Sequence, residues 1–184
     1  MIVCFTILMR MTAAQIYESV TNGGASDLAE VVGVLNRHRP WCLIGGLAVN
    51  CYVEPVYTLD ADIVVAASEV DAIKQDLAIA GFSVQEFSHS INARMAGSEL
   101  RIQLTTDARY QDFLTETRLM EVLGEQLPVA SLTNIVRGKI WAWQDETRRP
   151  TKRKKDELDL MRILEAHPEL RSLMPEEISK QVPV

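Results

Sequence analysis

Few cysteines and histidines occur in the sequence, and their arrangement excludes several kinds of site. The three cysteines, Cys4, Cys42 and Cys51, are odd in number, have no metal-ligand spacing, and two of them lie in apolar runs. They therefore indicate reduced, buried thiols of a cytoplasmic protein and not a disulfide framework. The three histidines are not clustered, so a zinc site is not expected, and no Ser-His-Asp or Cys-His pattern is present.

Long apolar runs, an excess of positive charge and internal repeats are also absent. No apolar stretch is long enough to span a bilayer, and we expect no membrane partner. The formal net charge of −6 argues against general attraction to nucleic acids or membranes, although it leaves room for a local basic patch. The length of 184 residues and the apolar fraction of 47% are those of a globular protein with a sizeable core.

The first nine residues, MIVCFTILM, are apolar but lack the basic leader and the small-residue cleavage site of a signal peptide. Two interpretations stay open: an N-terminal strand or disordered extension, and a misassigned start with translation beginning at Met11. We favour the second, because MTAAQIYESV is typical of an opening helix. We expect residues 1–130 to form an α/β core, with residues 1–10 as an extension, and residues 131–184 to form a helical region packed on it.

Periodicity predicts an α/β (α+β) fold, in which a small mixed β-sheet is flanked by helices and followed by a helical C-terminal part. Helical spacing and cap residues indicate helices over Asp27–Arg37, capped by Ser26 and Asp27, over Ser68–Ala80, and in a region from Ser131 that includes Asn134–Gln144. Alternation and apolar runs indicate strands over Trp41–Ile44, Thr58–Val65, Phe82–Phe87, Arg94–Ala96 and Leu100–Leu104, and a hairpin over Arg118–Leu123 and Gln126–Val129.

The stretch from Trp41 to Ala66 carries the strongest functional pattern, with a strand, a glycine turn, a short helix, a loop and a second strand. Gly45 and Gly46 allow a tight turn and open a helix whose N–H groups favour an anion. Asp60 and Asp62 are two apart on a strand, so both point to the same face. Paired carboxylates repel each other, and a magnesium ion relieves that repulsion. The stretch therefore predicts a site for a nucleoside triphosphate and a divalent cation, whereas the structural alternative is a glycine turn beside a solvated acidic strand end.

This pattern of Gly-Gly, a spacer and Asp-x-Asp followed by apolar residues resembles the signature of the DNA polymerase β-like nucleotidyltransferase superfamily. In that family the glycines contact the triphosphate and the paired carboxylates hold magnesium. The resemblance implies a Mg²⁺ cofactor, with Asp60 and Asp62 as catalytic metal ligands and Gly45 and Gly46 as nucleotide-binding residues.

The family usually has a third carboxylate on the strand that RIQL occupies here, and by position Gln103 stands in its place. Glutamine can coordinate or orient a ligand, but it brings no charge and is a poor general base. Asp107, just past that strand, is a candidate substitute. Two functions therefore stay open: an active transferase, with Gln103 in the catalytic set, and a weakened one that acts as a nucleotide-, RNA- or protein-binding module.

A second motif follows in the C-terminal region. Six of the eight residues from Arg148 to Lys155 are basic, and Lys-Asp-x-x-Asp follows at once. With Lys139, this resembles the minimal nucleotidyltransferases of the AbiEii toxin type, which share a lysine on one helix, a basic loop, and a helix that opens with Lys-Asp-x-x-Asp. The resemblance implies nucleotide-binding roles for Lys139, Lys155, Asp156 and Asp159. A structural role is the alternative, because Asp156 and Asp159 share a helix face and can form a salt bridge with Lys139.

Together the two motifs predict transfer of a nucleoside monophosphate from a nucleoside triphosphate to an acceptor hydroxyl. Lys139, Lys155 and Arg149 would offset the charge of the triphosphate. The acceptor hydroxyl can belong to an RNA end such as that of a tRNA, to a protein, or to a small molecule as in antibiotic-modifying transferases. The toxin–antitoxin type implies a cognate antitoxin as a partner.

Overall fold

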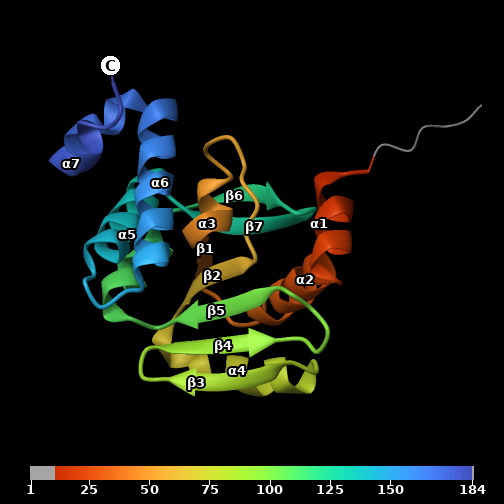
Figure 1. Ribbon diagram of the computed structural model, residues 1–184. Coiled ribbons are helices and arrows are strands. Elements are labelled where there is room, and N and C mark those ends of the chain that lie inside the picture. The colour runs from red at the N-terminus through yellow and green to blue at the C-terminus, as the bar shows by residue number, and fades with distance from the viewer. Residues whose placement is uncertain (1–10, 184) are drawn as a thin grey trace, which may run out of the picture.

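A mixed seven-stranded sheet forms the centre of the molecule, in the strand order β3-β4-β5-β2-β1-β7-β6 (Figure 1). The computed structural model describes residues 11–183, so the expectations for residues 1–10 and for Cys4 lie outside the described residues. The strands are β1 Trp41–Ile44, β2 Asp60–Val65, β3 Ser83–Phe87, β4 Ser90–Arg94, β5 Arg101–Thr105, β6 Thr117–Val122 and β7 Glu125–Ala130.

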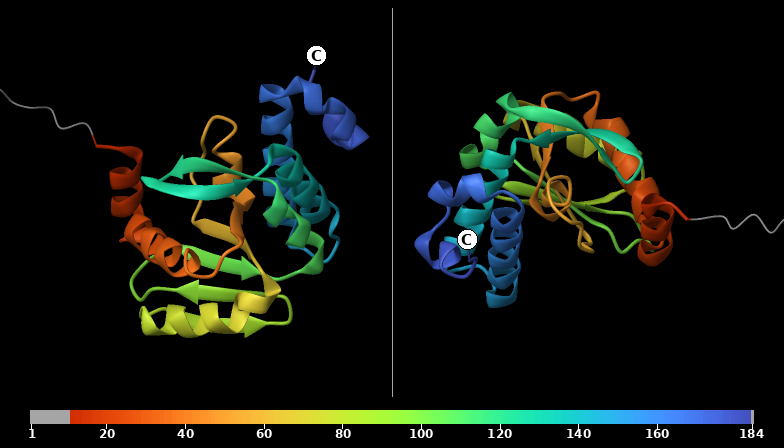
Figure 2. Two further views of the ribbon diagram at one scale, coloured as in Figure 1. Left: turned by 180° about the vertical axis from the view of Figure 1, so that it is seen from behind. Right: turned by 90° about the horizontal axis from the view of Figure 1, so that it is seen from above.

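Seven α-helices and three 3₁₀ segments connect and cover the strands within residues 11–183. The helices are α1 Ala13–Thr21, α2 Gly24–Leu35, α3 Gly45–Val49, α4 Val70–Ile79, α5 Leu132–Gln144, α6 Pro150–Ala166 and α7 Glu176–Ser179. The 3₁₀ segments are η1 Ala67–Glu69, η2 Ala108–Thr115 and η3 Pro168–Leu173. Figure 2 shows α2 and α4 against one face of the sheet and the pair α5 and α6 on the opposite side. The expected sheet, flanking helices and helical C-terminal part are therefore confirmed.

The pairing of the central strands decides which polar side chains become neighbours. Strand β1 is antiparallel to β2, and β2 is parallel to β5. The register places Asp60 beside Arg101 and Asp62 beside Gln103. Because side chains alternate between the faces of a strand, all four lie on one face of the sheet. The opposite face carries the apolar side chains between them.

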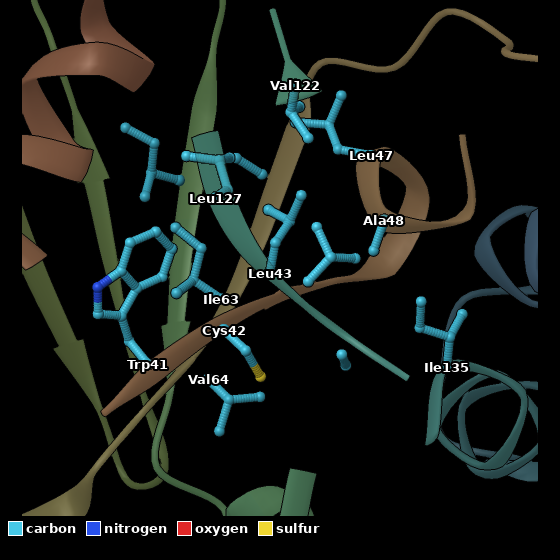
Figure 3. Packing of buried hydrophobic residues seen from close by; sticks show 14 of the residues in the cluster. Trp41, Cys42, Leu43, Leu47, Ala48, Ile63, Val64, Val122, Leu127 and Ile135 are labelled. Carbon is cyan, nitrogen blue, oxygen red and sulfur yellow. The ribbon is translucent and has the colours of Figure 1, made fainter. Parts of the chain in front are cut away.

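The core lies where apolar side chains of the central strands meet the helices. Leu43 and Ile63 are fully buried, and Figure 3 shows them gathered with Leu47 and Ala48 of α3. The expected short helix after the glycine turn is confirmed, and it spans Gly45–Val49. Burial of α3 against the sheet holds a helix that would be too short to form alone in water.

Cys42 and Cys51 fit the expectation of reduced thiols in apolar surroundings. Cys42 is fully buried, Cys51 is half-buried, and neither forms a disulfide in the described part of the chain. Burial raises the pKa of the Cys42 thiol to about 12 and that of Cys51 to about 11, so neither is a reactive thiolate at neutral pH.

The expected cap of the second helix was wrong. Helix α2 begins at Gly24 and not at Asp27. Its N-cap residue is Gly23, which has no side chain to accept a hydrogen bond from the first turn. Instead, the Glu18 carboxylate accepts hydrogen bonds from the backbone N–H groups of Ala25 and Ser26 and from the Ser26 hydroxyl. A residue of the preceding helix thus satisfies the exposed N–H groups, and sequence patterns within one helix do not reveal this.

The strand expected at Arg94–Ala96 was misplaced. Strand β4 spans Ser90–Arg94 and pairs with β3 in a hairpin that turns between Phe87 and Ser90. Its polar residues obscured it in the sequence, while the following Met95 to Glu99 form the turn to β5. The correct bounds matter, because they carry Arg94 to the end of a strand beside β5.

The basic run was expected to be a loop, and this was also wrong. Arg149 is the N-cap of α6, Pro150 is its first residue, and the helix continues without a break through the four basic residues from Lys152 to Lys155. Proline suits the first helical position because its φ is fixed and its missing N–H is not needed there. Lysine and arginine are good helix formers, so these basic residues continue the helix that Pro150 begins.

The helical C-terminal part packs on the rest of the molecule through α3. Helices α5 and α6 pack against each other, and both contact α3. Ser131 caps α5 as expected, because its side chain accepts a hydrogen bond from the Asn134 N–H. Among the residues described, no helix is both long and apolar enough to cross a membrane.

Candidate active site

The glycine turn brings the start of α3 against the acidic strand. Gly45 has a φ of +71°, and a Cβ atom there would lie 2.1 Å from the Asp62 Oδ2 atom. A Cβ on Gly46 would lie 3.3 Å from the Thr58 hydroxyl oxygen and 3.6 Å from Lys155 Nζ. Gly45 therefore cannot be replaced without moving Asp62, and the turn keeps the backbone open toward the lysine.

Asp60 is surrounded by positive charge. Arg101 Nε lies 2.7 Å from Oδ1, Lys152 Nζ lies 2.7 Å from Oδ2, and Lys155 Nζ lies 3.8 Å from Oδ2. Burial alone would raise the pKa of Asp60, but the hydrogen bond and charge of Lys152, with the charges of Arg101 and Lys155, hold that pKa below its usual value. Asp60 is therefore ionised, and its negative charge is compensated by this chain.

Asp62 differs from Asp60 although the two are neighbours on one strand. Among the residues described, no side chain or backbone group donates a hydrogen bond to its carboxylate. Burial raises the pKa of Asp62, the charge of Lys139 opposes this shift, and the charge of Asp60 adds to it. On β5, Gln103 stands in register with Asp62. Asp62 is thus the carboxylate that gains most from a bound cation.

A buried ion network joins α5 to α6 behind the carboxylates. Lys139 Nζ lies 2.9 Å from Asp156 and 2.6 Å from Asp159, and all three side chains are at least nine-tenths buried. Arg148 pairs with Asp156 and Arg162 pairs with Asp159, each at 2.8 Å. Burial alone would lower the pKa of Lys139, but the two carboxylates override this and raise it. The expected salt bridge between Lys139 and the two aspartates is therefore present.

These residues surround a cavity of about 380 Å³ between the sheet, α3 and the C-terminal helices. Seven basic side chains and three carboxylates line it. The carboxylates are Asp60, Asp62 and Asp156, and the basic residues are Arg94, Arg101, Lys139, Arg148, Arg149, Lys152 and Lys155. A concave site with this excess of positive charge attracts anions, although the whole chain is acidic.

Nine of the ten residues to which the sequence assigns catalytic or nucleotide-binding roles line this one cavity. They are Gly45, Gly46, Asp60, Asp62, Gln103, Lys139, Arg149, Lys155 and Asp156. Asp159 does not line the cavity but lies behind Lys139, where it pairs with Arg162. Asp107, the candidate substitute for a third carboxylate, is also outside the cavity wall: it caps η2 and pairs with Arg109 at 2.7 Å.

Four basic residues of the cavity wall were not chosen as site residues from the sequence: Arg94, Arg101, Arg148 and Lys152. Arg101 lies two positions before Gln103, so strand alternation alone would have put both on one face. Arg94 could not be found, because its strand was misplaced. Arg148 and Lys152 were noticed only as part of the charge run, since a loop gives no spacing from which to choose one basic residue among several.

The donor set suits one divalent cation held by two carboxylates. Asp62 faces the cavity without a hydrogen-bond donor among the described residues, and the amide oxygen of the neighbouring Gln103 is a hard ligand of the same kind. Within residues 11–183, no group of three or more His, Cys, Asp and Glu side chains could hold a metal ion. Asp60 completes the set only if Lys152 leaves its carboxylate.

The order of the strands, the glycine turn on α3 and the paired aspartates on β2 together make this a nucleotidyltransferase-like fold. Solved structures of this fold match most of the chain at low sequence identity. No family model matches the chain, and no curated protein matches its sequence.

The antibiotic-resistance factor ANT(2″)-Ia matches with a TM-score of 0.57 and 13% identity, over 85% of this chain and 87% of that one. An antigenic nucleotidyltransferase-like protein from Paracoccidioides brasiliensis matches with a TM-score of 0.54 and 16% identity, over 87% and 86%. The lincosamide antibiotic adenylyltransferase LnuA, with lincomycin bound, matches with a TM-score of 0.51 and 11% identity, over 73% and 94%. At sequence identities this low, the structural matches establish the fold alone. The reaction has to be inferred from the residues of the site.

Proposed function

We propose that the protein transfers a nucleoside monophosphate from a nucleoside triphosphate to an acceptor hydroxyl. One observation carries the proposal: two adjacent carboxylates share a basic cavity with a glycine turn that leaves the backbone open. Paired carboxylates alone fit many sites. Their placement among seven basic side chains fits a ligand that is itself strongly anionic and is accompanied by a cation.

The proposed roles follow from position. Gly45 and Gly46 let the phosphates approach the backbone, and Lys155 and Arg149 compensate their charge. Asp60 and Asp62 would hold magnesium, which when bound neutralises charge on the phosphate oxygens. Lys139 acts differently, because its ammonium is already held by two buried aspartates. We assign it and Asp156 to fixing the cavity wall rather than to direct phosphate contact.

Two observations bear on which acceptor hydroxyl the protein uses. ANT(2″)-Ia and LnuA are named for antibiotic resistance and a lincosamide antibiotic, which supports a small-molecule acceptor. The basic lining favours an anionic acceptor instead, and Arg94 and Arg101 extend it onto the sheet floor beside Gln103. We therefore favour an RNA end, such as that of a tRNA, over a neutral or cationic small molecule and over a protein hydroxyl. The AbiEii toxin type and a cognate antitoxin remain part of this proposal.

A second candidate function depends on Gln103. It stands in register with Asp62, where a third carboxylate would complete the charge of the site. Its amide has no negative charge and cannot take a proton from a hydroxyl at neutral pH. In this alternative the protein binds a nucleotide or RNA in the cavity as a regulatory module, with little or no transfer.

A transfer assay separates the two functions. The wild type is incubated with Mg²⁺ and nucleoside triphosphates radiolabelled at the α-phosphate, together with pooled RNA, protein or metabolites as acceptors. We predict label in the RNA pool, and a loss of at least about a hundredfold in Asp62→Asn. Asp71→Asn, an exposed aspartate paired with Lys74, is the matched control and should keep full activity.

The variant Gln103→Asp completes the assay. General-base assistance is worth about 10²–10⁴-fold, so a rise of that size in Gln103→Asp over a nearly inactive wild type would establish the binding-module alternative. Clear wild-type activity that falls in Gln103→Asp would establish the transferase. Absence of transfer by both proteins to every pool would contradict the proposed reaction.

A further inference from the structure

Both oxygens of the Asp60 carboxylate are held by cations of this chain. Arg101 contacts Oδ1 and Lys152 contacts Oδ2, each at 2.7 Å. Magnesium binds a carboxylate oxygen at about 2.0–2.1 Å and requires near-octahedral space around it. A divalent cation and the Lys152 ammonium cannot share Oδ2, because they need the same oxygen and repel each other. In this arrangement, Lys152 blocks the binding of a divalent cation to Asp60.

Lys152 is also the partner of Asp60 that can leave. Arg101 reaches Asp60 from the neighbouring strand, where the sheet register fixes its backbone. Lys152 comes from the first turn of α6, and its side chain is 31% exposed. A lysine has a flexible four-carbon stem and three donors that turn with it, so its ammonium can move several ångströms without a backbone shift. Arg149 and Lys155, three residues before and after Lys152, line the same cavity.

We propose that Lys152 is a switch that keeps the Asp60–Asp62 metal site closed until a nucleotide binds. This inference rests on the proposed function, because it requires a polyanionic ligand in the cavity. A triphosphate carries several negative charges against the single charge of Asp60, so it draws the Lys152 ammonium onto its phosphate oxygens. Oδ2 of Asp60 then accepts the cation that accompanies the nucleotide.

The switch makes the binding of the cation and of the nucleotide mutually dependent. Without nucleotide, Lys152 competes with a divalent cation for Asp60, and the affinity for that cation is low. With nucleotide, the competition ends and the affinity rises. By thermodynamic linkage the cation strengthens nucleotide binding by the same factor. The protein therefore does not load a metal ion on its own.

A titration with Mn²⁺ alone tests the closed state, with the free ion followed by electron paramagnetic resonance. The variant Lys152→Met keeps the length of the side chain and removes its charge. We expect Lys152→Met to bind Mn²⁺ roughly 10- to 100-fold more tightly than the wild type, since one cation next to the site is gone. Lys154→Met, on the same helical turn, is the control: its side chain is 76% exposed and pairs with Glu157, so it should leave Mn²⁺ affinity unchanged.

Two further variants tie the effect to this site. Adding Asp60→Asn to Lys152→Met should remove the gain in Mn²⁺ affinity, and Lys152→Gln should reproduce it. Circular dichroism establishes that each variant is folded. Equal Mn²⁺ affinity of the wild type and Lys152→Met would overturn the switch, and so would a gain that survives Asp60→Asn.

The open state is tested by repeating the titration with a non-transferable nucleoside triphosphate analogue. We expect the Mn²⁺ affinity of the wild type to rise at least about tenfold, and the advantage of Lys152→Met to shrink or vanish. No effect of the analogue on the wild type would overturn the switch. The proposed function fails separately: a protein that shows this pattern but transfers no label has the switch without the reaction.

Discussion

Lys139 is the buried charge on which the contact between α5 and α6 depends. Its ammonium lies within 3 Å of both Asp156 and Asp159, and the three side chains are almost completely buried. A buried charge is tolerated only with partners, and here Arg148 and Arg162 supply two more. The network therefore holds the helical wall of the cavity in one position.

Replacement of Lys139 by methionine should destabilise the protein. The change leaves Asp156 and Asp159 with one arginine partner each, in surroundings that penalise unpaired carboxylates. Breaking a buried ion pair by removing one partner costs about 3–5 kcal/mol, and we expect about 3 kcal/mol because the arginines remain. Urea denaturation measures the loss, with Lys154→Met as an exposed control that should change little. An unchanged midpoint for Lys139→Met would contradict this role.

Asp60 shows where reasoning from residue types alone misleads. Two aspartates on one strand face suggest that removing either relieves a repulsion and does not destabilise. The structure surrounds Asp60 with Arg101, Lys152 and Lys155, so its removal leaves three cations close together instead. The repulsion argument holds better for Asp62, because Lys139 and Lys152 act on its carboxylate by charge and neither forms an ion pair with it among the described residues. The sequence could not distinguish the two, because the cations come from β5 and α6.

Among the elements, the N-terminal end of α6 decides where the basic side chains point. A charge run in a loop would be a diffuse patch, whereas a helix gives each basic residue a fixed direction. Arg149, Lys152 and Lys155 are three residues apart and line the cavity. Arg153 instead donates to the Trp143 carbonyl, and the exposed Lys154 pairs with the partly buried Glu157. One face of the turn thus serves the cavity and the other faces away.

The two faces predict different effects of the same change in charge. Arg149→Ser with Lys155→Ser should weaken triphosphate binding by roughly 10- to 100-fold and flatten its salt dependence, because two cations leave the cavity. Lys154→Ser with Lys180→Ser removes the same charge from two exposed lysines outside the cavity wall and should leave both quantities unchanged. Fluorescence titration of a labelled nucleotide at several ionic strengths makes the measurement. Equal effects of the two double variants would contradict a specific role of the cavity residues Arg149 and Lys155. They would show that the protein attracts the nucleotide only through general electrostatic attraction.

Elements with strong local signals were predictable from the sequence, and the others were not. Apolar runs and glycine turns located β1, β2 and the β6–β7 hairpin to within a few residues. Strand β4 was missed because its residues Ser90 and Asn92 are polar, and pairing with two neighbours holds it in the sheet. The cap of α2 was missed because Glu18 supplies it from another helix.

At the scale of the whole molecule, the fold gathers two motifs that are about 80 residues apart in the sequence into one cavity. The glycine–aspartate motif lies on β2 and α3, and the basic motif lies on α5 and α6. Sequence spacing can nominate residues within each motif. It gives no distance between the two motifs. The contact between Lys152 and Asp60, which are 92 residues apart, could therefore not be predicted from the sequence.

In the proposed function, the cavity binds a nucleoside triphosphate together with a divalent cation at Asp60 and Asp62. Isothermal titration calorimetry with non-transferable analogues of each common nucleoside triphosphate, with Mg²⁺ and then with a chelator, tests it most directly. We predict that at least one analogue binds about tenfold or more tightly with Mg²⁺, and that Asp62→Asn loses this difference while Asp71→Asn keeps it. Equal affinity of the wild type with and without Mg²⁺, or unchanged binding by Asp62→Asn, would contradict the claim.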